Sequence, residues 1–224
     1  MKLVSNLYAY LWQGSDNNCN SCVFANALSG NRHVMVDPGH INTPSYREPA
    51  LDTLAKAMKA DGLDLADTGL VILTHCHPDH TEASSVFREK YHAQVAIHEM
   101  EAAIYKMLGG TADLLLREGE LELGEGGETK LDIIHSPGHS PGHITIYWPL
   151  EKVLIAGDVI FYGSTGRVDL PGGNPTQLKQ SIERLSEMEI EYLLCGHPYG
   201  NPGLLEGKEE VRQNFDTVKR YVLC

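Results

Sequence analysis

The hydrophobic pattern of the first third of the chain predicts short strands joined by tight turns. Apolar and aromatic residues recur with a period close to two over residues 3–12, and two further strands are expected over residues 21–28 and 33–36. Gly30 and Asn31 form the turn between the last two. Because these connections are too short for a crossover helix, we expect the three strands to form an antiparallel meander.

Further along the chain, helical and strand patterns follow one another. Helical spacing predicts helices over residues 48–60, 81–91, 99–108, 175–188 and 204–222. Apolar runs predict strands over residues 70–73, 94–97, 130–135, 144–148, 153–156 and 192–195. Residues 109–127 are rich in Gly and Glu and follow neither period, so we expect a functional loop or a mobile flap there. The mixture predicts an α/β fold, with residues 1–224 in a single domain.

Candidate metal ligands follow four of the predicted strands. After the strand 70–73 come His75, His77, Asp79 and His80. His139 follows the strand 130–135, Asp158 follows the strand 153–156, and His197 follows the strand 192–195. A rigid strand aims such side chains, and the loop that follows lets them converge. A lone histidine in a polar loop more often forms hydrogen bonds, but three histidines and an aspartate within six residues favour a metal site.

The number and type of these ligands favour a catalytic centre with two metal ions. Seven N and O ligands exceed the four of a tetrahedral zinc site, and they suit two metals roughly 3.5–4 Å apart with a shared carboxylate. Imidazole and carboxylate are compatible with Zn, Fe and Mn. We therefore expect two divalent metal ions, with zinc as the first expectation. His135 and His143 are not expected to be ligands.

The charge of the chain restricts its partners. A net charge of −12, from 18 basic and 30 acidic residues, disfavours nucleic acid, whose binding depends on Lys and Arg at the phosphates. No apolar run approaches the ~20 residues of a membrane span, and residues 1–6 do not resemble a signal peptide. We expect a cytoplasmic protein with a small-molecule substrate and no membrane partner. A homo-oligomer is compatible with the sequence, which does not fix the oligomeric state.

Five cysteines without a secretion signal do not indicate a disulfide framework. Cys19 and Cys22 form a C-x-x-C, which is compatible with a redox pair or half a zinc site. Since no second pair accompanies them, we favour small residues that enter a strand. Cys76 alternates away from the neighbouring ligands and is expected to pack inward.

The ligand motifs resemble those of the metallo-β-lactamase-fold superfamily. These are His-x-His-x-Asp-His at 75–80, Pro-Gly-His-Ser-Pro-Gly-His at 137–143, Gly-Asp at 157–158 and Gly-His at 196–197. The resemblance covers essentially the whole chain and implies a four-layer αββα sandwich with the metal site at the sheet edge. It implies that one metal binds His75, His77 and His139, that the second binds Asp79, His80 and His197, and that Asp158 bridges them. A metal-bound hydroxide is the nucleophile in that family, and Asp79 would help to manage protons as a catalytic residue.

A glycine-rich segment, residues 163–174, narrows the resemblance. It is similar to a segment of the glyoxalase II-like, or hydroxyacylglutathione hydrolase-like, branch, which implies hydrolysis of a small anionic thioester or a related ester. In this branch Arg167 would meet the substrate, and an internal salt bridge between Arg167 and Asp169 is the alternative. The chain departs from the family at Thr81-Glu82-Ala83, where a Gly pair is usual. Residues 198–224 leave room for one helix, so we expect no helical glutathione-binding domain.

Two other functions remain open at this stage. The segment 163–174, together with Thr-His-Cys-His at 74–77, also resembles persulfide dioxygenases. Those enzymes would hold a single iron with His75, His139 and Asp158 and oxidise a thiol-derived substrate, glutathione persulfide. A metal-binding sensor or partner domain without catalysis is the third alternative, against which the complete ligand set argues.

Overall fold

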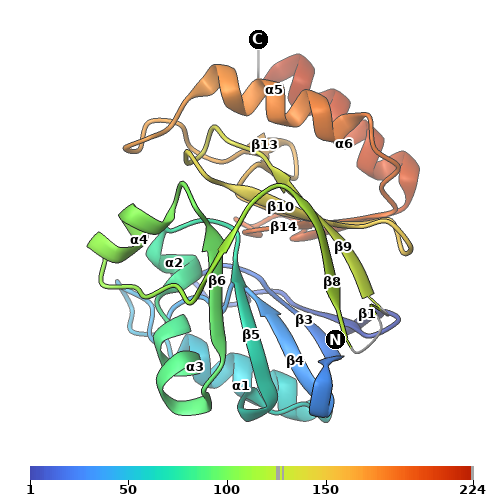
Figure 1. The fold of residues 1–224 in the computed structure, drawn as a ribbon. Helices are drawn as coiled ribbons and strands as arrows, with labels where there is room; N and C mark the ends of the chain where they lie inside the picture. The colour runs from blue at the N-terminus through green and yellow to red at the C-terminus, as the bar shows by residue number, and fades with distance from the viewer. Residues whose placement is uncertain (125–126, 128, 223–224) are drawn as a thin grey trace. The chain divides into compact units, whose positions relative to one another are not determined.

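The computed structural model describes residues 1–124, 127 and 129–222. The chain divides into two compact units, Met1–Leu116 with Glu122–Thr129, and Arg117–Leu121 with Lys130–Cys224. Each unit contains a large β-sheet and helices that cover one face of that sheet (Figure 1). Glu125 and Gly126, from the predicted flap, and Cys224 lie outside the described residues. The single domain over residues 1–224 stays a prediction.

The sheet of the first unit has seven strands in chain order. They are β1 (Lys2–Val4), β2 (Leu7–Tyr10), β3 (Ser21–Leu28), β4 (Arg32–Val36), β5 (Thr68–Leu73), β6 (Gln94–His98) and β7 (Leu114–Leu116). Pairing is antiparallel from β1 to β4, which confirms the meander, and parallel from β4 to β7. The single strand predicted over residues 3–12 is wrong, because the chain turns at Ser5, whose φ of 45° is left-handed.

Helices cover one face of this sheet. They are α1 (Ala50–Ala60), α2 (Pro78–Thr81), α3 (Ser84–Tyr91) and α4 (Ala102–Met107), and short 3₁₀ turns η1 (Ser29–Asn31) and η2 (Leu65–Asp67) precede β4 and β5. Met58 of α1, Phe87 of α3 and Tyr105 of α4 belong to one buried cluster with residues of β3–β6. Since β4 and β5 are parallel, their carboxyl ends lie at the same edge, which brings the residues after Val36 close to those after Leu73.

The second large sheet has six strands in the order β15-β14-β11-β10-β9-β8. Their bounds are β8 (Gly119–Leu123), β9 (Thr129–His135), β10 (Ile144–Trp148), β11 (Val153–Gly157), β14 (Tyr192–Cys195) and β15 (Leu204–Glu206), and a small hairpin joins β12 (Ile160–Phe161) to β13 (Ser164–Thr165). Helices α5 (Pro175–Ser186) and α6 (Lys208–Tyr221) pack through Ile182 and Phe215 into one buried cluster. The parallel pairing of β11 with β14 places Asp158 and His197 after neighbouring strand ends.

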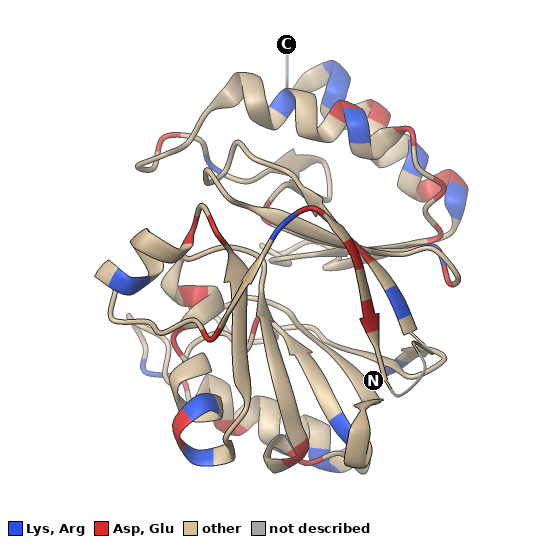
Figure 2. Ribbon diagram, viewed as in Figure 1, with Lys and Arg blue, Asp and Glu red and all other residues tan. Residues whose placement is uncertain are grey.

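Two predictions in this part of the chain are wrong for identifiable reasons. The flap expected over residues 109–127 contains β7 and β8, and β8 went unrecognised because its alternation of Glu and Leu is short and lies between glycines; Figure 2 shows acidic residues in red along this strand. The terminal helix begins at Lys208, since residues 204–206 pair with β14 and Gly207, with φ +100°, ends the strand. Among the described residues, no helix is long and apolar enough to cross a membrane.

Candidate metal centre

The motif after β5 gathers three imidazoles within the first unit. The ring centroid of His75 lies 4.6 Å from that of His77 and 4.2 Å from that of His80. The loop predicted at this point is partly wrong, because Pro78 starts the short helix α2, which contains Asp79 and His80. Proline at a first helical position is pre-organised for the turn. The backbone N–H of His80 donates to the carbonyl oxygen of His77 at 3.0 Å, which places His80 beside His75.

Asp37, the residue after β4, holds this motif in place. Its carboxylate accepts hydrogen bonds from the backbone N–H and the hydroxyl of Thr74, at 2.8 and 2.7 Å, and from Nδ1 of His80 at 2.8 Å. Asp37 is only 2% exposed. These hydrogen bonds fix the loop after β5 to the end of β4.

Residues 17–19 hold Asp79 from the other side. Nδ2 of Asn17 donates to Oδ2 of Asp79 at 2.7 Å, and the backbone N–H of Cys19 donates to the Asp79 carbonyl oxygen at 3.3 Å. His40, three residues after Asp37, is buried with Nδ1 2.5 Å from Oε2 of Glu82. Glu82, in the segment Thr81-Glu82-Ala83, thus has a buried imidazole as its partner. Nothing in the sequence pointed to Asn17, whose role depends on the path of the segment after β2.

The second unit places one carboxylate between two imidazoles. Oδ2 of Asp158 lies 3.5 Å from Nε2 of His139 and 3.5 Å from Nε2 of His197. All three side chains are buried. Asp158 follows β11, His197 follows β14, and His139 lies on the loop after β9, so three strand ends supply the group. Such a carboxylate is suited to bind two metal ions at once.

Two glycines leave room for this group. A Cβ atom on Gly196 would lie 2.2 Å from Oδ1 of Asp158, and one on Gly166 would lie 1.9 Å from the Asp158 carbonyl oxygen. No side chain can occupy either position without displacing Asp158. Gly166, in the glycine-rich segment 163–174, thus lies in close contact with the backbone of Asp158.

The two histidines that were not expected to be ligands make other contacts. Nε2 of His143 accepts a hydrogen bond from the backbone N–H of Asp158 at 3.0 Å, so this buried imidazole supports a candidate ligand. Nε2 of His135 lies 2.9 Å from the carbonyl oxygen of Pro141, to which it donates. No sequence pattern indicated that His143 supports Asp158, because the contact depends on the pairing of β10 with β11.

Comparison with known proteins decides the family. Residues 14–197 match the family model described as the metallo-β-lactamase superfamily. The chain belongs to this superfamily. It is 32% identical over 188 residues to a probable metallo-hydrolase of Methanocaldococcus jannaschii, an alignment that covers 76% of this chain and 84% of the relative. It is also 31% identical over 169 residues to the hydroxyacylglutathione hydrolase of Rhodopseudomonas palustris, covering 75% of this chain and 62% of that enzyme.

Solved structures confirm the metallo-β-lactamase fold that the sequence predicted. A metallo-β-lactamase family protein from Thermus thermophilus superimposes with a TM-score of 0.75 at 22% identity, covering 97% of this chain and 79% of that chain. A second protein, crystallised in a di-iron-bound form, gives a TM-score of 0.66 at 28% identity, covering 88% and 93%. The α/β class with two large sheets is thereby established.

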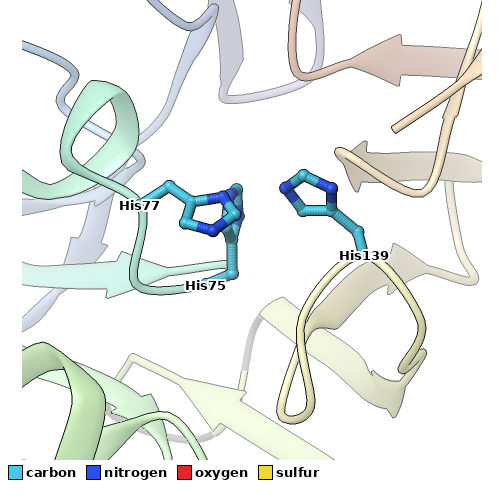
Figure 3. Close-up of side chains that lie close together, drawn as sticks. All are labelled: His75, His77 and His139. Carbon is cyan, nitrogen blue, oxygen red and sulfur yellow. The ribbon is translucent and has the colours of Figure 1, made fainter. Parts of the chain in front are cut away.

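The donor chemistry of this superfamily member fits divalent metal ions. Nδ1 of His139 donates to the carbonyl oxygen of Arg167 at 2.7 Å. Nδ1 of His75 lies 3.0 Å from the Thr74 hydroxyl, whose own proton points to Asp37, so His75 is the donor. Nδ1 of His80 likewise donates to Asp37, so Nε2 is the atom that each of these three rings has available to bind a metal ion. Figure 3 shows His75 and His77 on the segment after β5 and His139 on the loop after β9.

Arg167 forms the internal salt bridge that the sequence left as an alternative. Nε and Nη2 donate to Oδ1 and Oδ2 of Asp169 at 2.9 and 2.8 Å, and both side chains are about two-thirds exposed, at 68% and 67%. The hydrogen bonds from Arg167 lower the pKa of the Asp169 carboxyl. The backbone carbonyl oxygen of Arg167 accepts a hydrogen bond from Nδ1 of His139, so the backbone of Arg167 lies next to a candidate ligand. An anionic substrate would compete with Asp169 for the guanidinium of Arg167.

The cysteines of this superfamily member are packing residues in the described structure. Cys19, Cys22, Cys76 and Cys195 are buried. Burial raises the pKa of the Cys22 and Cys76 thiols, so neither thiolate is favoured near neutral pH. The inward packing predicted for Cys76 is confirmed by its place in the core of the first unit.

Proposed function

We propose that this chain is a dinuclear metal-dependent hydrolase that acts on a small thioester. One divalent ion would bind His75, His77 and His139, and the second would bind Asp79, His80 and His197, with Asp158 shared. Among the described residues, three groups could hold a metal ion: His75, His77 and His139; His75, His80 and Asp158; Asp79, His80 and His197. The middle group supports a shared Asp158, because it combines this residue with one proposed ligand of each ion.

The single observation that carries the proposal is the position of Asp158. Its Oδ2 lies at the same 3.5 Å from Nε2 of His139 and of His197, which belong to different ligand sets. A carboxylate that served one ion would be expected near one set. The relative crystallised in a di-iron-bound form gives further support for two ions.

The ligand set also suits hydrolysis. When bound, two metal ions of this kind lower the pKa of a coordinated water towards ~7 and polarise a carbonyl oxygen. Asp79 would exchange a proton at its carboxylate, which Asn17 orients by the 2.7 Å hydrogen bond. Asp37 and Thr74 keep His80 and His75 in the tautomer that leaves Nε2 as the ligand atom.

The thioester substrate is supported by the relative from Rhodopseudomonas palustris, which is named hydroxyacylglutathione hydrolase. Glutathione carries carboxylates, and an exposed guanidinium is the side chain best suited to bind one in a bidentate way. Arg167 would bind this anionic end of the substrate. A bound carboxylate would then replace Asp169 as its partner.

The proposal is tested by metal analysis together with a hydrolysis assay on a hydroxyacyl thioester of glutathione. We expect two metal ions per chain and measurable hydrolysis for the wild type. Asp158→Ala should lose most of the metal, and its activity should fall by more than about 100-fold, the upper end of the effect of outer-shell partners. Asp52→Ala, an exposed change in α1, is the matched control and should behave as wild type.

A different outcome would contradict the proposal in a recognisable way. One iron per chain, with oxygen uptake on glutathione persulfide and no thioester hydrolysis, would assign the chain to an oxidative reaction. Full metal content and full activity in Asp158→Ala would contradict the proposal that the two ions share Asp158.

A further inference from the structure

The first unit contains a cavity of about 350 Å³ between β2, the segment that follows it and one face of α1. Among the residues that the structure describes, none of the seven candidate ligands lines this cavity, and no lining side chain carries a charge. Its walls are mainly apolar, with Trp12 and Leu54 as large side chains and Asn18 and Ser21 as polar ones. The cavity is therefore a separate feature that the proposed hydrolysis does not use.

Four side chains of α1, three of them small, form one wall of the cavity and leave it open. Ala50, Thr53, Leu54 and Ala57 line it, and their spacing of i, i+3, i+4 and i+7 places them on one face of the helix. Protein interiors are normally filled to crystal-like density, and larger side chains on this face would fill the space. Ala50 and Leu54 on this face are buried, as are Leu51 and Met58 on the adjoining face.

The opposite wall is held by hydrogen bonds. The backbone N–H of Trp12 donates to Oδ1 of Asn20 at 2.8 Å, and its indole N–H donates to the carbonyl oxygen of Asp16 at 2.8 Å. A Cβ atom on Gly14 would lie 2.1 Å from the indole ring, so only glycine lets the ring lie here. The carboxylate of Glu48 accepts from the backbone N–H groups of Ser15 and Asp16. The wall is thus formed before any ligand binds, as in most small-molecule sites.

We propose that this cavity binds a small, uncharged, apolar molecule and that its occupancy is coupled to the metal-binding motif through Asp37. The volume lies in the range of roughly 300–1,000 Å³ typical of small-molecule sites. It is too small for a helix, whose diameter with side chains is about 10 Å. A charged ligand would lose its hydration without gaining a partner, because the lining has no charged side chain and the N-terminal ammonium of Met1, a lining residue, is already paired with Asp61 at 2.7 Å.

The coupling follows from two residues that line the cavity. Oγ of Ser21 donates to the carbonyl oxygen of Asp37 at 2.6 Å, and Sγ of Cys19 lies 3.5 Å from the same oxygen. The carboxylate of Asp37 binds His80, and the backbone N–H of Cys19 binds the carbonyl oxygen of Asp79. A molecule that shifts residues 18–21 therefore shifts two proposed ligands. This coupling rests on the proposed metal centre, whereas binding to the cavity does not.

The binding is tested by titrating the full chain, stripped of metal, with N-phenyl-1-naphthylamine, an uncharged apolar dye that fluoresces more strongly in apolar surroundings. We expect saturable binding to the wild type. Ala57→Leu fills the cavity and should weaken binding by about tenfold or more. Ala60→Leu makes the same change at an exposed position of α1 outside the cavity and should bind as wild type. Thr53→Leu, on the exposed edge of the same helix face, is the second variant if Ala57→Leu does not fold.

Absence of dye binding by the wild type, or undiminished binding by folded Ala57→Leu or Thr53→Leu, would overturn the proposal. The coupling is tested by repeating the titration with zinc-loaded protein. If bound dye changes the affinity of the chain for zinc, bound zinc must change the affinity for the dye by the same factor. Identical dye affinities with and without zinc would overturn the coupling. A chain that retains no zinc would contradict the proposed function instead, while the titration of metal-free protein would still decide whether the cavity binds the dye.

Discussion

Nδ1 of His80 donates to Oδ2 of Asp37 over 2.8 Å, and both side chains are buried. Asp37 follows β4 and His80 lies in α2, just beyond the neighbouring parallel strand β5. The same carboxylate binds the backbone and the hydroxyl of Thr74. One buried carboxylate thus connects the end of the core sheet with two candidate ligands, because Thr74 also contacts His75.

Asp37→Asn is expected to weaken metal binding without removing a ligand. The amide keeps the shape of the side chain, but it loses the charge and one of the two acceptor atoms that Thr74 and His80 share. We expect metal affinity to fall by about 10–100-fold. The measurement is competition with a chromogenic chelator, with exposed Asp67→Asn as the control. Wild-type affinity in Asp37→Asn would show that the carboxylate does not position the metal ligands.

Gly196→Ala tests the space around Asp158. The added Cβ would lie 2.2 Å from Oδ1 of Asp158, so the carboxylate must move. We expect lost metal and a fall in thioester hydrolysis of about 100-fold, as for other misplacements near 1 Å. Gly163→Ala is the control, since Gly163 has φ +63° and no neighbour within 4 Å, and it reports backbone strain alone. Equal effects of the two variants would refute the steric argument.

Arg167→Gln separates substrate binding from structure. If Arg167 binds an anionic substrate, KM for the thioester should rise by about 10- to 100-fold, the value of a charge-assisted contact, while metal content stays unchanged. Asp169→Asn releases the guanidinium from its ion pair and should leave KM unchanged or lower it. A KM that rises equally in both variants would indicate that the ion pair matters only for the shape of this segment.

Glu118 is expected to make stability depend on pH within the second unit. Hydrogen bonds from Arg184 are the main cause that lowers the pKa of its carboxyl, and the backbone N–H of His135 adds to this. A lowered folded pKa means that the stabilisation is complete above the unfolded value and is lost as pH falls through the folded value. Because the pair is exposed, we expect Glu118→Gln to reduce the free energy of unfolding at pH 7 by only about 0.2–1 kcal/mol.

The measurement for Glu118 is urea unfolding of both proteins between pH 7 and pH 3. The difference in unfolding free energy should shrink as the carboxyl protonates and should vanish at the acid end. Glu206→Gln, an exposed change in strand β15 of the same unit, is the control. A difference that stays constant over the whole pH range would contradict the assignment to the charge of Glu118.

The elements that the sequence predicted are those whose pattern is local. The strand Ser21–Leu28 was predicted with both of its bounds, and helix α1 followed from the spacing of Leu51, Leu54 and Met58. The candidate ligands were found because they follow apolar runs. By contrast, β15 has three residues and is defined by its pairing with β14, which no local pattern records.

The residues that hold the candidate ligands in place by hydrogen bonds could not be predicted in the same way. The contact between Asp37 and His80 joins residues 43 positions apart, and that between Asn17 and Asp79 joins residues 62 apart. Such hydrogen bonds depend on which strands are neighbours and parallel, and this is a property of the tertiary fold. An acidic residue after a strand, such as Asp37, does not by itself reveal its partners, and no local pattern pointed to Asn17.

The central claim is that the chain binds two metal ions with a shared Asp158, and anomalous diffraction tests it most directly. Crystals of protein purified without chelator would be measured on both sides of the zinc, iron and manganese absorption edges. We predict two anomalous peaks, one bound by His75, His77 and His139 and the other by Asp79, His80 and His197, with Asp158 at both. A single peak, or two peaks of which only one contacts Asp158, would contradict this account.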